Sequence, residues 1–131
     1  MRRVLLVEDN ESTIDVVEME LKCLGYEVTI ARDGLEALDR VTEQSPDLVI
    51  MDIHLPKMNG FEAVRRIRAI PAVHDIPILA ATAKALNGDQ ERCLAAGCDG
   101  YIAKPFTHRE LEVAINGTMK RRLSALQLDE K

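Results

Sequence analysis

Short apolar runs alternate along this chain with longer stretches in which apolar residues recur every three or four positions. Consecutive apolar residues are typical of a strand that is covered on both faces, as in a parallel sheet, whereas the wider spacing indicates one buried face of a helix. The runs lie at residues 4–7, 28–31, 47–51, 76–81 and 101–103. We expect the second and fifth of these strands to lie nearer the edges of the sheet.

Aliphatic side chains mark the helical stretches between these runs. The first stretch carries Ile14, Val17, Leu21 and Leu24 and stops at Gly25, a residue type that commonly follows the last turn of a helix. Leu35, Leu38 and Val41 mark the second stretch, and the other three are centred on residues 61–67, 86–96 and 111–119. Strand and helix therefore alternate from one end of the chain to the other.

This alternation predicts a doubly wound α/β domain with a five-stranded parallel sheet, or (βα)5. Each parallel pair of strands needs a right-handed crossover, and the crossover places a helix on one face of the sheet. The 131 residues suffice for one domain of ordinary size. We expect the domain to span residues 1–122 and residues 123–131 to form a polar C-terminal tail.

Composition and charge exclude several classes of protein. The net charge of −5 provides no positive field that would attract nucleic acid or an anionic membrane. Every apolar run is far shorter than the ~20 residues that cross a bilayer, and the first residues do not resemble a secretory signal. The three cysteines lack the spacing of a zinc site, so we expect buried, inert thiols. We expect a cytoplasmic protein without nucleic-acid or membrane partners.

Polar residues follow the predicted strands at the edge where ligands bind in open parallel sheets. Glu8 and Asp9 follow the first strand, Asp52 the third, Thr82 the fourth and Lys104 the fifth. If the first and third strands are neighbours, three carboxylates converge. Two carboxylates ~4 Å apart repel each other by roughly 4 kcal/mol at an effective dielectric constant of 20, so such a cluster requires a cation. Oxygen ligands favour Mg²⁺.

A hydroxyl group and an ammonium group at the same edge complete a site for a phosphoryl group. Lys104 and the metal would neutralise phosphoryl oxygens, and Thr82 would donate a hydrogen bond. No Ser, Cys or His is placed as a nucleophile at this edge. A carboxylate can itself attack phosphorus, and Asp52, which ends the most apolar central strand, is the candidate nucleophile.

Four segments of the chain together resemble the receiver domain of bacterial two-component response regulators. They are residues 4–10, 47–60, 81–83 and 97–106, and they occur in the order and at the separations typical of that family. The resemblance covers nearly the whole chain. It implies a flavodoxin-like sheet with strand order 2-1-3-4-5.

The resemblance also implies roles for individual residues in metal binding. Asp52 matches the phosphoacceptor, and Glu8 and Asp9 match the acidic pair that holds Mg²⁺. His54 matches the position whose backbone carbonyl is a further metal ligand. Glu8 stands where Asp is commoner, and we expect its longer side chain to be tolerated because that residue usually acts through water.

Three more residues match positions that contact or read the phosphoryl group. Thr82 resembles the switch hydroxyl, Tyr101 the switch aromatic residue and Lys104 the lysine that contacts the phosphoryl group. The family also implies a cis peptide bond between Lys104 and Pro105, which aims the lysine at the site.

The implied function is a signalling switch in which Asp52 accepts a phosphoryl group from a histidine kinase or a histidine phosphotransfer protein. The protein would be a substrate and output module rather than an enzyme. We expect it to bind a downstream protein through the fourth helix, fifth strand and fifth helix, roughly residues 84–119. We expect a monomer or a weak dimer that resembles the stand-alone receivers.

Three other functions deserve comparison. A receiver domain of a hybrid histidine kinase would have the same motifs. A metal-dependent phosphatase with an aspartyl nucleophile typically has a second Asp two residues later, where this chain has His54. A flavodoxin-type cofactor carrier needs a phosphate-binding loop after the first strand, where the acidic residues 8–9 would repel phosphate unless a metal were bound.

Overall fold

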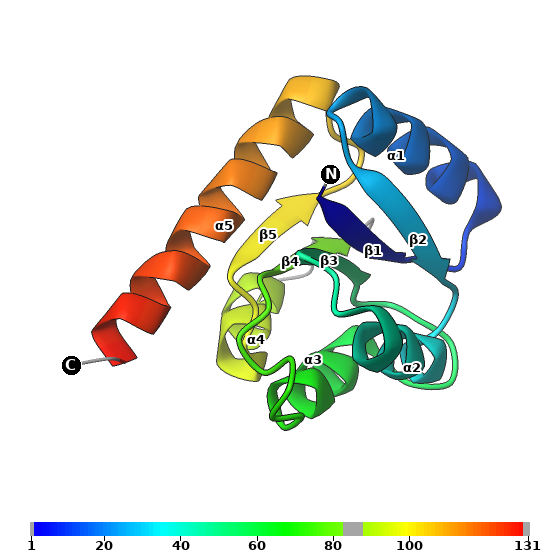
Figure 1. The fold of residues 1–131 in the computed structure, drawn as a ribbon. Helices are drawn as coiled ribbons and strands as arrows, with labels where there is room; N and C mark the ends of the chain where they lie inside the picture. Colours follow the sequence, from blue (N-terminus) through cyan, green and yellow to red (C-terminus); the bar gives the residue numbers. More distant parts are fainter. Residues whose placement is uncertain (1, 83–87, 130–131) are drawn as a thin grey trace.

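The computed structural model describes residues 2–82 and 88–129, which form a parallel sheet covered by helices on both faces (Figure 1). The strands are β1 (Arg3–Val7), β2 (Glu27–Ala31), β3 (Leu48–Asp52), β4 (Ile78–Thr82) and β5 (Gly100–Ala103). The helices are α1 (Glu11–Cys23), α2 (Gly34–Gln44), α3 (Gly60–Arg68), α4 (Asp89–Ala96) and α5 (His108–Asp129). The predicted doubly wound α/β fold is confirmed.

The strand order is β2-β1-β3-β4-β5, as the family resemblance implies. β1 lies between β2 and β3, and its register pairs Leu6 with Ile50 of β3. β2 lies on one side of β1, and β3, β4 and β5 follow in order on the other side. The carboxyl ends of β1 and β3 consequently border the crevice in which open α/β sheets bind ligands.

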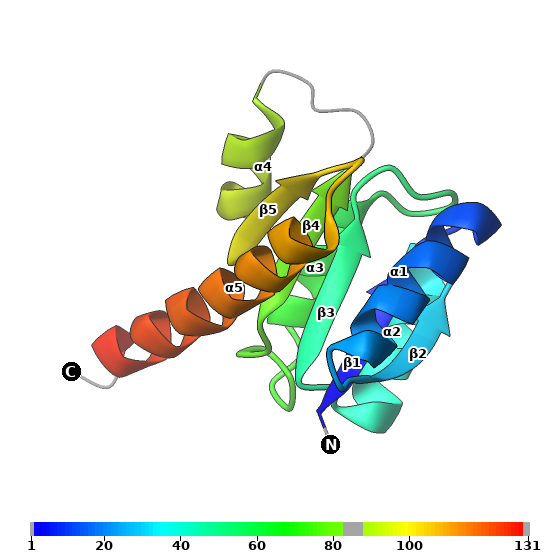
Figure 2. The ribbon, with the colours of Figure 1, turned by 90° about the horizontal axis from the view of Figure 1, so that it is seen from above.

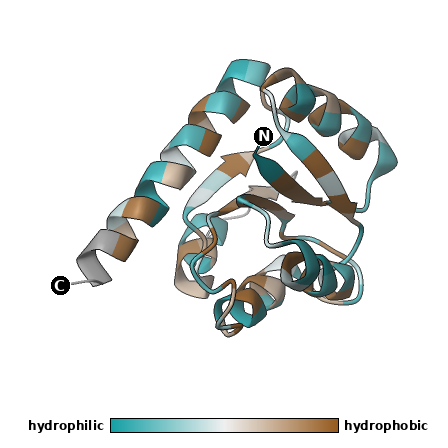
Figure 3. Ribbon diagram, viewed as in Figure 1, coloured by the Kyte–Doolittle hydropathy of each residue, from teal (hydrophilic) through white to brown (hydrophobic). Residues whose placement is uncertain are grey.

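Two hydrophobic layers hold the helices against the sheet. Helices α1 and α5 cover one face, and α2, α3 and α4 cover the other (Figures 1 and 2). Because neighbouring residues of a strand point to opposite faces, Leu5 of β1 packs in the layer with α2 and α3, while Leu6 packs in the layer with α1 and α5. Figure 3 shows the hydrophobic residues concentrated along the central strands.

Four helices begin with a polar side chain that caps the first turn. Each of these side-chain oxygens accepts a hydrogen bond from a backbone amide three residues later, and the capping residues of α1, α2, α3 and α5 are Asn10, Asp33, Asn59 and Thr107. Such caps satisfy amides that have no partner inside the helix. Only three residues, 8–10, separate the end of β1 from the start of α1, so Glu8 and Asp9 lie in a short connection that ends at the Asn10 cap.

The buried face of α2 differs from the predicted one. Leu35 was expected in the apolar stripe but is 49% exposed, and Gly34, Ala37 and Val41 are the buried residues of this helix. Ala37 lies three residues after Gly34 and Val41 four residues after Ala37, so the three share one face of the helix, and Ala37 and Val41 belong to the hydrophobic core. Gly34 lets Met58 approach the start of α2, because an added Cβ atom would lie 2.8 Å from the Met58 Cβ.

The predicted burial of the cysteines is confirmed for two residues and wrong for the third. Cys93 and Cys98 are buried, whereas Cys23 is exposed at the end of α1. The predicted fourth helix is present as α4, and the part of that prediction before Gly88 lies outside the described residues. Helix α5 continues to Asp129, so residues 123–129 are helical. In the described chain, no helix is both long and apolar enough to cross a membrane.

Candidate functional site

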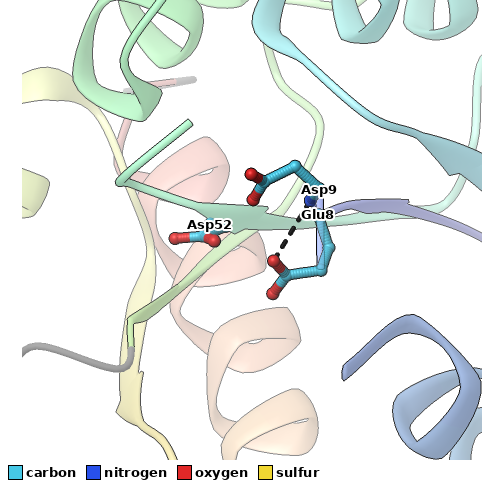
Figure 4. A group of neighbouring side chains, drawn as sticks. All are labelled: Glu8, Asp9 and Asp52. Carbon is cyan, nitrogen blue, oxygen red and sulfur yellow. Dashed lines mark hydrogen bonds between the residues drawn. The ribbon is translucent and has the colours of Figure 1, made fainter. Parts of the chain in front are cut away.

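Three carboxylates meet where β1 and β3 end (Figure 4). Asp52 is the last residue of β3, and Glu8 and Asp9 directly follow β1. One oxygen from each of the three side chains lies within 4.8 Å of the others. The convergence that the sequence pattern predicts is therefore present, and these oxygens form a donor set that could hold a metal ion.

Two backbone amides hold the Asp52 carboxylate and the peptide group that follows this residue. The amide of His54 donates a hydrogen bond to Asp52 Oδ1 at 2.9 Å. The amide of Gly60, at the start of α3, donates to the carbonyl of Ile53 at 3.0 Å. A Cβ atom at Gly60 would lie 2.6 Å from the Asp52 carbonyl oxygen, so only glycine lets α3 approach the end of β3 this closely.

Glu8 is buried and turns its carboxylate toward its own backbone and Lys104. Glu8 Oε2 accepts hydrogen bonds from the amides of Asp9 and Asn10, at 3.1 and 3.2 Å. Its other oxygen, Oε1, accepts a hydrogen bond from Lys104 Nζ. Burial alone would raise the pKa of Glu8, but Lys104 and the Asn10 amide hold this pKa below its ordinary value. Glu8 is therefore a carboxylate whose charge is already compensated.

Asp52 has less compensation for its charge. The pKa of Asp52 is raised to about 6, chiefly by burial and also by the charge on Glu8. The His54 amide and the Lys104 ammonium lower this pKa but only partly offset the rise. A cation placed among the carboxylates would stabilise Asp52 in its ionised form, because it would remove both the repulsion and part of the desolvation penalty.

Lys104 lies at the end of β5 with its ammonium turned into the site. Its amide donates to the carbonyl of Thr82 at 2.7 Å, which continues the pairing of β4 with β5. Its side chain is 14% exposed, and Nζ lies 3.7 Å from Asp52 Oδ2. The Lys104–Pro105 peptide bond is cis, as the resemblance implies.

The two predicted switch residues lie on neighbouring strands. Thr82 ends β4 and is fully buried. Tyr101 of β5 is paired with Ala80 of β4 and is half-buried against the layer beneath α4. Burial raises the pKa of the Tyr101 hydroxyl, and the nearby charge of Asp89 adds to this effect. The structure thus places Thr82 at the carboxylate edge and Tyr101 next to α4.

One buried acidic residue beside the site, Asp89, has no signal in the sequence. Asp89 is the first residue of α4 and is only 2% exposed. Its Oδ2 lies 3.8 Å from Nε2 of His54. An acidic residue in the first turn of a helix is common because it complements the helix dipole, so the sequence gives no signal that this one is buried.

A shallow apolar groove adjoins the site. Its volume is about 310 Å³, and it lies between α1 and the segment that follows β5. The lining residues are Ser12, Thr13, Val16, Val17, Glu20, Lys104, Pro105 and Phe106. Lys104 therefore borders both the groove and the carboxylate cluster.

Comparison with known proteins identifies relatives over most of the chain. The family model described as response regulator receiver domain matches residues 4–116. The polar-differentiation response regulators DivK of Brucella anthropi and Brucella ovis are each 41% identical over 106 residues. Each alignment covers 81% of this chain and 86% of the relative.

Solved structures show the same likeness. The receiver domain of the sensor histidine kinase PA1611 from Pseudomonas aeruginosa, solved with a magnesium ion in its active-site cleft, is 42% identical with a TM-score of 0.84. That match covers 91% of this chain and 98% of the other. The chemotaxis protein CheY4 of Vibrio cholerae is 34% identical with a TM-score of 0.83, over 88% of this chain and 97% of the other. This chain therefore belongs to the response regulator receiver domain family.

Proposed function

We propose that Asp52 accepts a phosphoryl group from a histidine kinase or a histidine phosphotransfer protein. The observation that carries this proposal is the position of the Asp52 carboxylate, which is buried among Glu8, Asp9 and Lys104 at the carboxyl end of β3. Of the three clustered carboxylates, Asp52 alone lies on a strand of the described sheet. Its Oδ2 lies 3.7 Å from Lys104 Nζ, which is too far for a direct hydrogen bond.

In the proposed transfer, an oxygen of Asp52 attacks the phosphorus atom of the donor's phosphohistidine. The bond from phosphorus to the donor nitrogen breaks, and its electron pair stays on the imidazole. Lys104 stabilises the negative charge of the transferred group, and the Thr82 hydroxyl donates a hydrogen bond to one of its oxygens. The protein acts as a phosphoacceptor with limited self-dephosphorylation, and not as an enzyme with a separate substrate.

We propose Mg²⁺ as the cofactor of this site. The donor set is built from carboxylate oxygens, which suits a hard cation. Asp9 and Asp52 would bind the ion together with the backbone carbonyl of His54, and Glu8, whose oxygens already accept three hydrogen bonds, would act through water. When bound, Mg²⁺ supplies positive charge that neutralises the oxygens of the phosphoryl group.

The groove beside Lys104 is the proposed contact site for the phosphodonor. A donor histidine must approach Asp52 closely, so its protein has to cover the surface around the site. The groove of about 310 Å³ between α1 and the segment after β5 offers an apolar surface next to Lys104. Val16 on the outer side of α1 is 56% exposed and lines it.

The proposed output surface comprises α4, β5 and α5. Thr82 would move toward the phosphoryl group, and Tyr101 would turn into the space that this movement opens. A second hollow, of about 520 Å³, lies on β5 and α5 and offers a site for a downstream protein. Its lining residues are Tyr101, Ile102, Thr107, Arg109, Glu110, Val113 and Ala114. Residues 83–87 of the proposed surface lie outside the described residues.

We further propose a cytoplasmic regulator that is a monomer or a weak dimer. Receivers that dimerise through β5 often have two acidic residues before the switch aromatic, and this chain has Asp99 and Gly100 there. Asp99 is held within the chain by Arg68, whose Nη2 lies 2.8 Å from Asp99 Oδ2. A stand-alone regulator is supported by the DivK relatives, whose length this chain covers to 86%.

A second candidate is a receiver domain of a hybrid histidine kinase. The likeness to the receiver of the kinase PA1611, at 42% identity, favours it. The two candidates differ in where the phosphoryl group comes from. A kinase domain encoded on the same polypeptide would identify the hybrid, whereas transfer from a separate phosphotransfer protein would support the stand-alone regulator.

Intact-mass analysis after incubation with acetyl phosphate and Mg²⁺ tests the proposed function. We expect the mass of one phosphoryl group to be added to the wild type and to the Asp15→Asn control, which changes an exposed carboxylate on α1. We expect no added mass on Asp52→Asn. Labelling of Asp52→Asn to the wild-type extent would contradict the proposal.

A further inference from the structure

His54 connects the proposed phosphorylation site to helix α4. Its backbone amide donates a hydrogen bond to Asp52 Oδ1 at 2.9 Å. Its imidazole Nε2 lies 3.8 Å from Asp89 Oδ2, at the start of α4. The imidazole is 40% exposed, whereas the Asp89 side chain is 3% exposed. One residue therefore contacts Asp52 through its backbone and faces a buried carboxylate on α4 through its ring.

The Asp89 carboxylate has a fixed place in the fold. It occupies the first turn of α4, where the helix dipole favours negative charge. Tyr101 of β5 lies close enough for the charge of Asp89 to contribute to the raised pKa of its hydroxyl. Because Asp89 is buried in the first turn of α4 and the His54 ring is 40% exposed, the imidazole is the partner with more freedom to move.

We propose that Asp89 is a positioning residue that holds the His54 imidazole toward α4 and thereby sets how the ring lies beside Asp52. The proposal rests on the proposed function, because its consequence is a change in the lifetime of the phosphoryl group on Asp52. His54 follows the acceptor by two residues, so a small rotation of its side chain changes what lies next to the transferred group.

The affected step is hydrolysis of the aspartyl phosphate. The oxygen of a water molecule forms a bond to phosphorus, and the bond from phosphorus to the Asp52 oxygen breaks. The electron pair of that bond returns to the Asp52 carboxylate, and the water proton passes to the solvent as phosphate leaves. The approach of this water depends on the space beside Asp52, and an imidazole that is no longer held by Asp89 would occupy that space differently.

The contact also makes α4 and the site depend on each other. A protein that binds α4 and shifts its first turn would move Asp89, and so would alter the position of the His54 ring. By thermodynamic linkage, a modification at Asp52 that moves the ring would change the binding of that protein to the same extent. This route to α4 is separate from the proposed route through Thr82 and Tyr101.

A double-mutant cycle on the phosphoryl lifetime tests the proposal. The variants are Asp89→Ala, His54→Ala and the combination, each labelled with acetyl phosphate and Mg²⁺ and then separated from the donor. We expect Asp89→Ala to change the half-life by at least about threefold in the wild-type background, and by much less when His54 is already Ala. Glu91→Ala, which removes an exposed acid from the same turn of α4, should leave the half-life unchanged.

A spectroscopic measurement separates positioning from a general effect on folding. The ring ¹⁵N resonances of His54 should shift in Asp89→Ala and stay in place in Glu91→Ala. If Asp89→Ala loses the native circular dichroism spectrum, Asp89→Asn takes its place in the cycle, because it removes the charge and keeps the shape. An equal change in half-life in both His54 backgrounds, or no change in either, would overturn the proposal. Failure of the wild type to accept a phosphoryl group would instead contradict the proposed function.

Discussion

Lys104 Nζ lies 3.7 Å from Asp52 Oδ2, although β4 separates the strands that carry these two residues. Lys104 follows β5, and Asp52 ends β3. The ammonium also donates a hydrogen bond to Glu8, which follows β1. One side chain thus links the ends of three strands, and its positive charge lies where an incoming phosphoryl group would bring negative charge.

Replacing this lysine should slow phosphorylation strongly. We expect Lys104→Ala to lower the rate of labelling by acetyl phosphate by about 100-fold, the usual effect of removing one charge that stabilises a transition state. Lys22→Ala, which changes an exposed lysine on α1, is the control and should retain the wild-type rate. Mass spectrometry at timed intervals measures both. A rate within about twofold of the wild type would remove Lys104 from the proposed mechanism.

The raised pKa of Asp52 predicts that its ionised form destabilises the metal-free fold. Its folded-state pKa is about 6, against 3.8 for the ordinary group. Stability from the protonated carboxyl is therefore fully present below pH 3.8 and is lost as the pH rises through about 6. In EDTA at pH 7, we expect Asp52→Asn to be more stable than the wild type by about 2 to 3 kcal/mol.

Urea unfolding of both proteins across pH 4 to 7 measures this difference. The stability advantage of Asp52→Asn should shrink as the pH falls below about 6, the folded-state pKa of the carboxyl. Asp15→Asn, which alters an exposed carboxylate, is the control for a general effect of charge. An advantage that stays constant over this range would show that burial does not raise the pKa of Asp52.

Loss of Asp9 should remove the response of the fold to Mg²⁺. A ligand at ten times its dissociation constant stabilises the native state by about 1.4 kcal/mol, because it binds the folded protein alone. We expect millimolar Mg²⁺ to raise the melting temperature of the wild type and of Asp15→Ala, and to leave Asp9→Ala nearly unchanged. Equal shifts in all three proteins would place the bound metal elsewhere.

Gly60 should tolerate no side chain, because its backbone supports Asp52. A Cβ atom there would lie 2.4 Å from Ile53 Cα and 2.6 Å from the Asp52 carbonyl oxygen. We expect Gly60→Ala to destabilise the fold by about 2 to 4 kcal/mol and to slow the phosphorylation of Asp52.

Gly117 provides the matched comparison for this substitution. It lies inside α5, and the nearest atoms to an added Cβ are 3.9 Å away. Gly117→Ala should therefore stabilise the protein by about 0.5 to 1 kcal/mol, through the lower entropy of its unfolded chain. Similar effects of the two substitutions in urea unfolding would show that the close approach at Gly60 is not what requires glycine.

Much of the fold and the arrangement of the site follow from local patterns. Apolar runs identify the central strands because both of their faces are covered, and every carboxyl end of a parallel sheet lies at the same edge. The sequence therefore predicts that the polar residues at the strand ends lie near one another. Glu8 and Asp52 meet for this reason.

Other features depend on contacts between distant segments, which a local pattern does not encode. The spacing of Leu35, Leu38 and Val41 predicts Leu35 inside, but Gly34, Ala37 and Val41 form the buried face of α2 and Leu35 is exposed. Asp89 has the sequence pattern of an ordinary first-turn acid, but in the fold it is buried and its carboxylate lies 3.8 Å from the His54 ring. Asp99 is likewise buried because Arg68 of α3 and Arg122 of α5 both reach it.

The location of the acyl phosphate tests the central claim most directly. Borohydride reduces an aspartyl phosphate to homoserine, so the modified residue can be identified by peptide mass spectrometry. After incubation with acetyl phosphate and Mg²⁺, we predict homoserine at position 52 alone, with Asp9 and Asp15 unchanged. Homoserine at Asp9 or at any other aspartate, with position 52 unmodified, would contradict the account.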